Sequence, residues 1–247
     1  MSKYKIGITE AGDAGLDLSW ANKLDTVDGA IVITKTPNNA FIREVLKHKD
    51  KLIVHATITG NGGSIIEPNV PNVETTYQAI EKLRRSGFPI EKITIRVDPI
   101  IPDKEHIKNA AYVIDKFASS GYRRFRVSII DMYPHVRQRF VDAGIKLPYG
   151  DNFSPSFIQC QAVDEMLRKI KTLFPGIQIE SCAEPRLSEP IKCGCISAYD
   201  LALLGLNPED ADAVGFQRKN CLCYSGKTEL LTTKHRCTNQ CLYCYWR

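Results

Sequence analysis

The first 159 residues contain no cysteine, and no stretch of the chain approaches the roughly 18 apolar residues that a membrane-spanning helix needs. The start of the sequence, MSKYKIGITE, also lacks the apolar core of a secretory signal. A scaffold held by disulfides would not leave so long a stretch without cysteine, which argues against a small secreted protein. These absences predict a cytoplasmic protein in a reducing compartment, with no membrane contact.

The nine cysteines that are present crowd toward the other end of the chain. Seven of them fall between Cys193 and Cys244. Because cytosolic thiols stay reduced, a group of this kind favours metal binding over cross-linking.

Positive charge is concentrated in the same part of the chain. Residues 213–247 contain six basic residues against one acidic residue, whereas residues 1–212 are neutral. The basic residues are Arg218, Lys219, Lys227, Lys234, Arg236 and Arg247. They could attract an anionic substrate such as nucleic acid or a phosphate, or they could offset the charge of thiolate ligands.

Short β-rich runs alternate with amphipathic helical stretches over the first 190 residues. Strands are expected at residues 5–9, 30–34, 52–59, 93–100, 124–130 and 177–182, and helices at 74–86, 105–120, 155–173 and 198–206. Gly87 and Gly121 directly follow two of these helices, where a residue in the left-handed conformation commonly ends a helix. Ser154 is the expected N-cap of the third helix.

Repeated strand–helix units predict parallel strands joined by right-handed crossovers. The expected fold is a partial TIM-type (β/α)6 barrel over residues 1–190. Residues 191–247 are expected to form a cysteine-rich, cluster-binding segment packed on it, and a strand within residues 228–233 would bring Cys237 to the open end of the barrel.

Chemistry in such folds collects at the C-terminal ends of the strands. The polar residues found there are Glu10, Asp13, Thr34, Lys35, Thr57, Thr59, Asn61, Arg96, Asp98, Ser128, Asp131, Tyr133, Glu180 and Glu184. Arg96 and Asp98 could anchor a cosubstrate or form a structural ion pair. His55, inside a predicted strand, is interpreted as a core histidine with satisfied hydrogen bonds.

The strongest signal is CTNQCLYCYW, which contains Cys237-x3-Cys241-x2-Cys244. Three close thiolates can hold a [4Fe–4S] cubane while leaving its fourth iron without a protein ligand. In radical S-adenosylmethionine (SAM) enzymes that iron binds the amino and carboxylate groups of SAM, and one-electron reduction yields a 5′-deoxyadenosyl radical. Tyr243 could pack beside the adenine or simply provide hydrophobic cover, and a zinc site is the other interpretation of this spacing.

A second set of cysteines comprises Cys182, Cys193, Cys195, Cys221 and Cys223. Four of these five could bind an auxiliary [4Fe–4S] cluster or a structural zinc ion, or they could be buried free thiols. Cys160 lies within a predicted helix and is interpreted as a small core residue.

Together with the C-terminal cysteine motif, the segments ATITGNGGSIIEPNVPN, IRVDPII, VSIIDMY and IESCAEP resemble the DUF1848 family of radical-enzyme-like proteins. The resemblance implies a partial TIM-type barrel with an iron–sulfur cluster bound at the C-terminus. It also favours Cys182, Cys195, Cys221 and Cys223 as the second metal set and leaves Cys193 as an extra. The segment TEAGDAG, residues 9–15, departs from the family pattern, which predicts a different substrate pocket.

The expected function is radical SAM catalysis of an isomerase or lyase type, acting on an organic substrate such as a hypermodified thymidine or another base of phage-type DNA. The candidate catalytic residues are Tyr243, Arg96 and Asp98, and the candidate cofactor-binding residues are Thr57, Asn61, Arg96, Ser128 and Glu180. Flavodoxin or ferredoxin would supply electrons. The alternative is a non-catalytic zinc or iron–sulfur module that binds nucleic acid or senses redox state.

Overall fold

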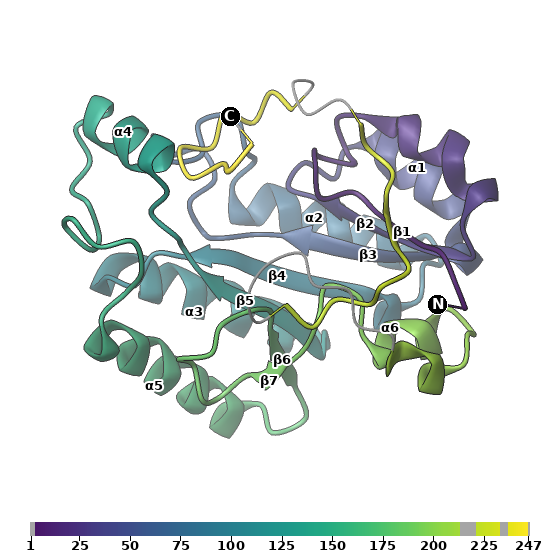
Figure 1. Ribbon diagram of the computed structural model, residues 1–247. Helices are drawn as coiled ribbons and strands as arrows, with labels where there is room; N and C mark the ends of the chain where they lie inside the picture. Colours follow the sequence, from purple (N-terminus) through teal and green to yellow (C-terminus); the bar gives the residue numbers. More distant parts are fainter. Residues whose placement is uncertain (1–2, 213–220, 233–236, 247) are drawn as a thin grey trace.

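The computed structural model describes residues 3–212, 221–232 and 237–246 and shows an eight-stranded parallel sheet (Figure 1). The strands are β1 Ile6–Ile8, β2 Gly29–Thr34, β3 Leu52–Thr57, β4 Ile93–Ile100, β5 Arg124–Ile129, β6 Gln178–Ser181, β7 Ile191–Lys192 and β8 Lys227–Glu229. They pair in the order β7-β6-β5-β4-β3-β2-β1-β8, so the last described strand lies beside the first.

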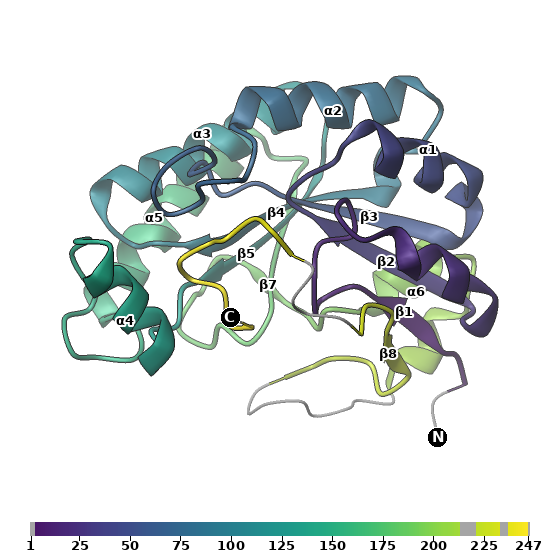
Figure 2. The same cartoon turned by 90° about the horizontal axis from the view of Figure 1, so that it is seen from above.

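The helices that connect these strands are α1 Asn39–Lys47, α2 Val73–Arg85, α3 Lys104–Ser119, α4 Pro134–Asp142, α5 Phe157–Leu173 and α6 Ala198–Leu203. Four 3-10 segments accompany them, namely η1 Leu18–Thr26, η2 Lys49–Lys51, η3 Ile90–Lys92 and η4 Pro208–Asp212. Figure 2 shows α1, α2, α3 and α5 on the outer side of the sheet, with the C-terminal segment on the opposite side.

The predicted alternation of parallel strands and helices is confirmed, and all six predicted strands are present, with bounds that differ from the prediction by at most two residues at either end. The expected strand within residues 228–233 exists as β8, which begins one residue earlier. Strand β7 and helices α1 and α4 were not predicted. Closure of the sheet into a partial barrel remains a prediction.

Local capping chemistry explains where the predicted helices begin and end. Gly87 and Gly121 adopt positive φ angles of 95° and 94° just after α2 and α3, as expected of left-handed C-terminal residues. The predicted N-cap of α5 is wrong: Ser156, rather than Ser154, caps the helix, because Gln159 completes a capping box with it.

The two faces of the sheet differ in character. In β3, Leu52, Val54 and Ala56 belong to the large hydrophobic core that includes the buried side chains of α1, α2, α3 and α5, and Ile53 joins a smaller apolar cluster with β1 and β2. Thr57, at the end of β3, instead lines a cavity. The side of the sheet away from α1, α2, α3 and α5 is therefore partly polar and can carry a site.

No helix in the described parts of the chain is long and apolar enough to cross a membrane. Of the basic residues singled out above, Arg218, Lys219, Lys234, Arg236 and Arg247 lie outside the described residues.

Candidate metal and cofactor site

A cavity of about 820 Å³ opens at the C-terminal ends of the strands. Its lining includes eleven of the polar strand-end residues that the sequence predicts, namely Glu10, Asp13, Thr34, Lys35, Thr57, Arg96, Asp98, Ser128, Asp131, Tyr133 and Glu184. The parallel arrangement explains this, because parallel strands end at the same edge of a sheet. Thr59, Asn61 and Glu180 are not among the lining residues.

Both cysteine groups line this same cavity. Cys182, Cys195, Cys221 and Cys223 contribute to its wall, and so do Cys237, Cys241 and Cys244. Any metal centres that the two groups hold would therefore face one shared space.

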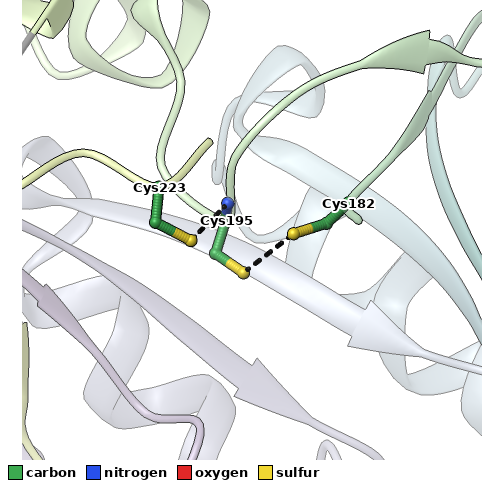
Figure 3. Close-up of side chains that lie close together, drawn as sticks. All are labelled: Cys182, Cys195 and Cys223. Carbon is green, nitrogen blue, oxygen red and sulfur yellow. Dashed lines mark hydrogen bonds between the residues drawn. The ribbon is translucent and has the colours of Figure 1, made fainter. Parts of the chain in front are cut away.

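The sulfur atoms of Cys182, Cys195 and Cys223 all lie within 4.8 Å of one another (Figure 3). The Sγ atoms of Cys182 and Cys195 are 3.7 Å apart, and the Cys195 amide donates to the Cys223 sulfur at 3.4 Å. The Cys223 amide in turn donates to the sulfur of Cys221, also at 3.4 Å. These four cysteines are the set that the family resemblance favours, and this group is compatible with metal binding.

Cys237, Cys241 and Cys244 form a wider group, because their three sulfurs do not all come within 4.8 Å of one another in the described structure. Burial raises the pKa of Cys241 to about 12, although Lys35 nearby opposes that rise. Burial also raises the pKa of Cys237. The backbone amide of Asn239 donates to the Cys237 sulfur and opposes this rise. A cubane needs each thiolate on a different iron, so a wide group of three sulfurs fits it better than a single ion.

The loop between Cys237 and Cys241 is held to the first two strands through Asn239, which is 3% exposed. The Asn239 side chain donates to Asp13 at 2.7 Å and accepts from Thr36 at 3.0 Å. Asp13 itself accepts hydrogen bonds from the Gly15 and Lys35 amides and from the Thr34 hydroxyl. TEAGDAG, the segment that departs from the family pattern, thus supplies an anchor for the cysteine loop.

If Cys237, Cys241 and Cys244 hold iron, replacing Asn239 with alanine is expected to make them release it about 10- to 100-fold faster, because groups that orient metal ligands contribute on that scale. The measurement is the rate at which an iron chelator removes iron from the anaerobically purified protein. Asn39→Ala is the control, since Asn39 is an exposed residue of α1 that bonds only Lys82 among the described contacts. Equal release rates for the two variants would contradict the anchoring role.

Tyr243 is held by a buried carboxylate. Its hydroxyl donates to Glu67, which is 1% exposed and also bonds the Lys35 ammonium at 3.0 Å and the Thr59 hydroxyl at 2.6 Å. The Lys35 ammonium lies 5.2 Å from the centre of the Tyr243 ring. Tyr243 both lines the cavity and positions the loop that carries Cys241 and Cys244.

The predicted residues Arg96, Asp98 and Ser128 come together at the ends of β4 and β5. The Arg96 guanidinium and the Ser128 hydroxyl both donate to the Asp98 carboxylate. Burial alone would raise the pKa of Asp98, but Arg96 and Ser128 outweigh it and lower that pKa. Arg96 lines the cavity, but its Nε is buried and has no partner among the described residues.

Glu180 lies below the cavity in a buried ion network. Its carboxylate accepts from Arg124 Nε at 3.0 Å and from Arg126 Nη2 at 2.6 Å, and Asp200 bonds Arg124 Nη1 at 2.6 Å. All four side chains are at most 5% exposed. Burial alone would raise the pKa of Glu180. Arg126 and Arg124 outweigh burial and lower that pKa below its ordinary value, so the carboxyl stays ionised. The structure gives Glu180 a scaffold role outside the cavity lining, and its cofactor-binding role stays a prediction.

The remaining singled-out residues lie away from the cavity lining. Asn61 bonds within its own loop and to Asn109, at 3.5 Å, and Cys193 donates to Glu180 at 3.7 Å. Cys160 is buried in the hydrophobic core. His55 is fully buried, but neither of its ring nitrogens has a partner among the described residues, so the prediction of a satisfied histidine is wrong.

Two residues that matter here, Glu67 and Asn239, were not singled out from the sequence. Glu67 lies in the segment ATITGNGGSIIEPNVPN, and Asn239 lies between two cysteines of the motif. The sequence signal for Glu67 is a charged residue directly after Ile65 and Ile66, and the signal for Asn239 is a polar residue between two candidate ligands.

A family model described as a domain of unknown function, DUF1848, matches residues 19–246. The chain belongs to the DUF1848 family. No curated protein matches it. The match covers both cysteine groups and every strand except β1, so this DUF1848 chain carries its candidate site within the family region.

Proposed function

We propose that this DUF1848 protein is a radical SAM enzyme whose [4Fe–4S] cluster is held by Cys237, Cys241 and Cys244. The observation that carries the proposal is the position of these cysteines, which line a cavity at the C-terminal ends of parallel strands. At about 820 Å³ the cavity is within the usual range for small-molecule sites. The chemistry supplied by a bound, reduced cluster would be one-electron cleavage of SAM to methionine and a 5′-deoxyadenosyl radical.

The protein's own groups would bind and orient the two substrates. Arg96 lines the cavity and can pair with a carboxylate, and Asp98 is positioned beside it as a hydrogen-bond acceptor for a ribose. Thr57 and Ser128 add hydroxyls to the same wall. Tyr243 would keep the cysteine loop in place through Glu67 and exclude water from the cluster.

A planar substrate such as a thymidine or another nucleic-acid base fits the aromatic side of the cavity. Tyr133, Tyr245 and Trp246 line it, and the Tyr133 and Tyr245 rings pack edge to face with centroids 5.0 Å apart. Aromatic faces of this kind stack on bases of any sequence. Flavodoxin or ferredoxin is the proposed electron donor.

The decisive experiment is anaerobic reconstitution of the full chain with iron and sulfide, reduction with dithionite, addition of SAM and detection of 5′-deoxyadenosine. We expect that product to form together with methionine. A protein that carries the complete cluster but yields no 5′-deoxyadenosine, with candidate bases present, would contradict the proposal. Zinc with no iron in the purified protein would favour a non-catalytic module instead.

A further inference from the structure

Three cysteines, Cys182, Cys195 and Cys223, form a compact trio that joins the two edges of the sheet. Cys182 and Cys195 follow β6 and β7, which form one edge, whereas Cys223 precedes β8, which forms the other. Their sulfurs nevertheless lie within 4.8 Å of one another, so segments from opposite edges meet at this point (Figure 3).

The sulfurs of Cys182 and Cys195 are spaced as two ligands on one ion are, and the Cys223 sulfur lies within 4.8 Å of both. Zinc binds thiolates tetrahedrally at about 2.3 Å, which places neighbouring sulfurs roughly 3.8 Å apart. The Sγ atoms of Cys182 and Cys195 are 3.7 Å apart. On a cubane the thiolates bind separate irons and point outward from its corners, so their sulfurs must stand farther apart.

We propose that Cys182, Cys195 and Cys223 bind a single thiophilic metal ion, with Cys221 as the fourth ligand, and that zinc is the ion this donor set takes. Cys221 is buried next to these three cysteines, and its sulfur accepts the Cys223 amide at 3.4 Å. Its sulfur does not come within 4.8 Å of all three others, so Cys221 would have to turn toward the ion to complete the site. The amide donors of Cys195 and Cys223 stabilise thiolate charge. Four thiolates with no open position make a structural site.

Gly194 makes the close approach of the two cysteine loops possible. It separates Cys193 from Cys195, and a Cβ on Gly194 would stand 2.3 Å from the carbonyl oxygen of Leu222 and 2.7 Å from the Cα of Cys223. Because these contacts are with backbone atoms, a side chain at position 194 would force the two loops apart. The absence of a side chain there allows sulfurs from the two edges to reach one ion.

This site is separate from the cluster of the proposed function, although it faces the same cavity. Zinc has no redox chemistry, so the ion would hold the two edges of the sheet together and shape the cavity wall without transferring electrons. The inference does not depend on SAM chemistry.

Metal analysis of three purified proteins tests it. The unsubstituted chain should hold one zinc together with the iron of the other group. The variant with Cys237, Cys241 and Cys244 all replaced by alanine should keep the zinc and lose the iron. The variant Cys195→Ser/Cys223→Ser should lose the zinc and unfold at a temperature about 10 °C lower, the scale expected when a tightly bound ligand is removed.

Since the serine variant could fail to fold, two further measurements use soluble protein. Cobalt(II) exchanged into the variant that lacks Cys237, Cys241 and Cys244 should give the intense visible bands of tetrahedral thiolate coordination. Gly194→Ala should lower zinc occupancy at least tenfold in a chelator competition. Gly176→Ala should leave it unchanged, because a Cβ on Gly176 meets only Arg123 Nε at an ordinary 3.9 Å.

Iron that persists after Cys237, Cys241 and Cys244 are replaced, or roughly eight irons in the unsubstituted chain, would show a second cubane and overturn the single-ion site. Complete absence of metal in the variant that lacks Cys237, Cys241 and Cys244 would overturn the single-ion site too. A chain with zinc but no iron would instead contradict the proposed function and leave this inference standing.

Discussion

Replacing Cys241 with alanine is expected to remove the bound iron and to lower 5′-deoxyadenosine formation by more than about 100-fold. Loss of a residue that merely orients a metal ligand already costs up to that factor, and Cys241 is itself a proposed ligand. The measurements are iron content, the visible absorption of the cluster and the yield of 5′-deoxyadenosine after reduction with dithionite. Retained iron and activity would place the cluster elsewhere in the chain.

Cys160→Ala is the matched control for this substitution. Cys160 is also a buried cysteine, 1% exposed, but it packs in the hydrophobic core on α5 and does not line the cavity. Its replacement should lower the free energy of unfolding by about 1 kcal/mol, as the loss of one small core side chain does, and leave iron content unchanged. The comparison separates loss of a ligand from loss of a buried sulfur.

Replacing Glu180 with glutamine is expected to lower the free energy of unfolding by about 3 to 5 kcal/mol, because it leaves two buried guanidinium groups with one carboxylate instead of two. The amide keeps the size of the side chain, so the loss comes from charge and hydrogen bonding to Arg124 and Arg126. Denaturant unfolding measures it. The affinity of the folded variant for SAM should not change, since Glu180 does not line the cavity.

The difference in unfolding free energy between the unsubstituted protein and Glu180→Gln should also depend on pH. Arg126 and Arg124 hold the pKa of Glu180 below its ordinary value despite burial, so its ionised form stabilises the folded state above that ordinary value. This contribution is lost as pH falls through the lowered pKa, and the two proteins should then converge in stability. Glu44→Gln is the control, because Glu44 pairs with Lys47 on the surface and should contribute at most about 1 kcal/mol. A Glu180 variant as stable as this control would contradict the network.

The parallel strands and the place where they end could be predicted from the sequence because both follow from local patterns. Runs of Ile and Val set the strands, Gly87 and Gly121 set the helix ends, and the rule that function collects at strand ends selected eleven of the residues that line the cavity. The pairing of β8 with β1 could not be predicted in that way, since it joins residues far apart in the chain.

Anchoring residues were harder to recognise than ligands. Cysteine has few roles in a reduced protein, so its spacing carries chemical meaning by itself. The anchoring contacts of Asn239 and Glu67 are with partners from distant segments, Asp13 and Tyr243 respectively. The ion network around Glu180 could not be predicted either, because the position of Glu180 in its strand says nothing about Arg124 and Arg126 on the neighbouring strand.

The position of β8 beside β1 also affects the order of folding. Ile6 pairs with Lys227, so this edge of the sheet cannot form until most of the polypeptide has been collapsed into place. Contacts between such distant residues impose a large loop-closure cost and tend to form late. Partly folded chains would therefore lack the cavity that both cysteine groups line, and metal binding would show that the native topology is complete.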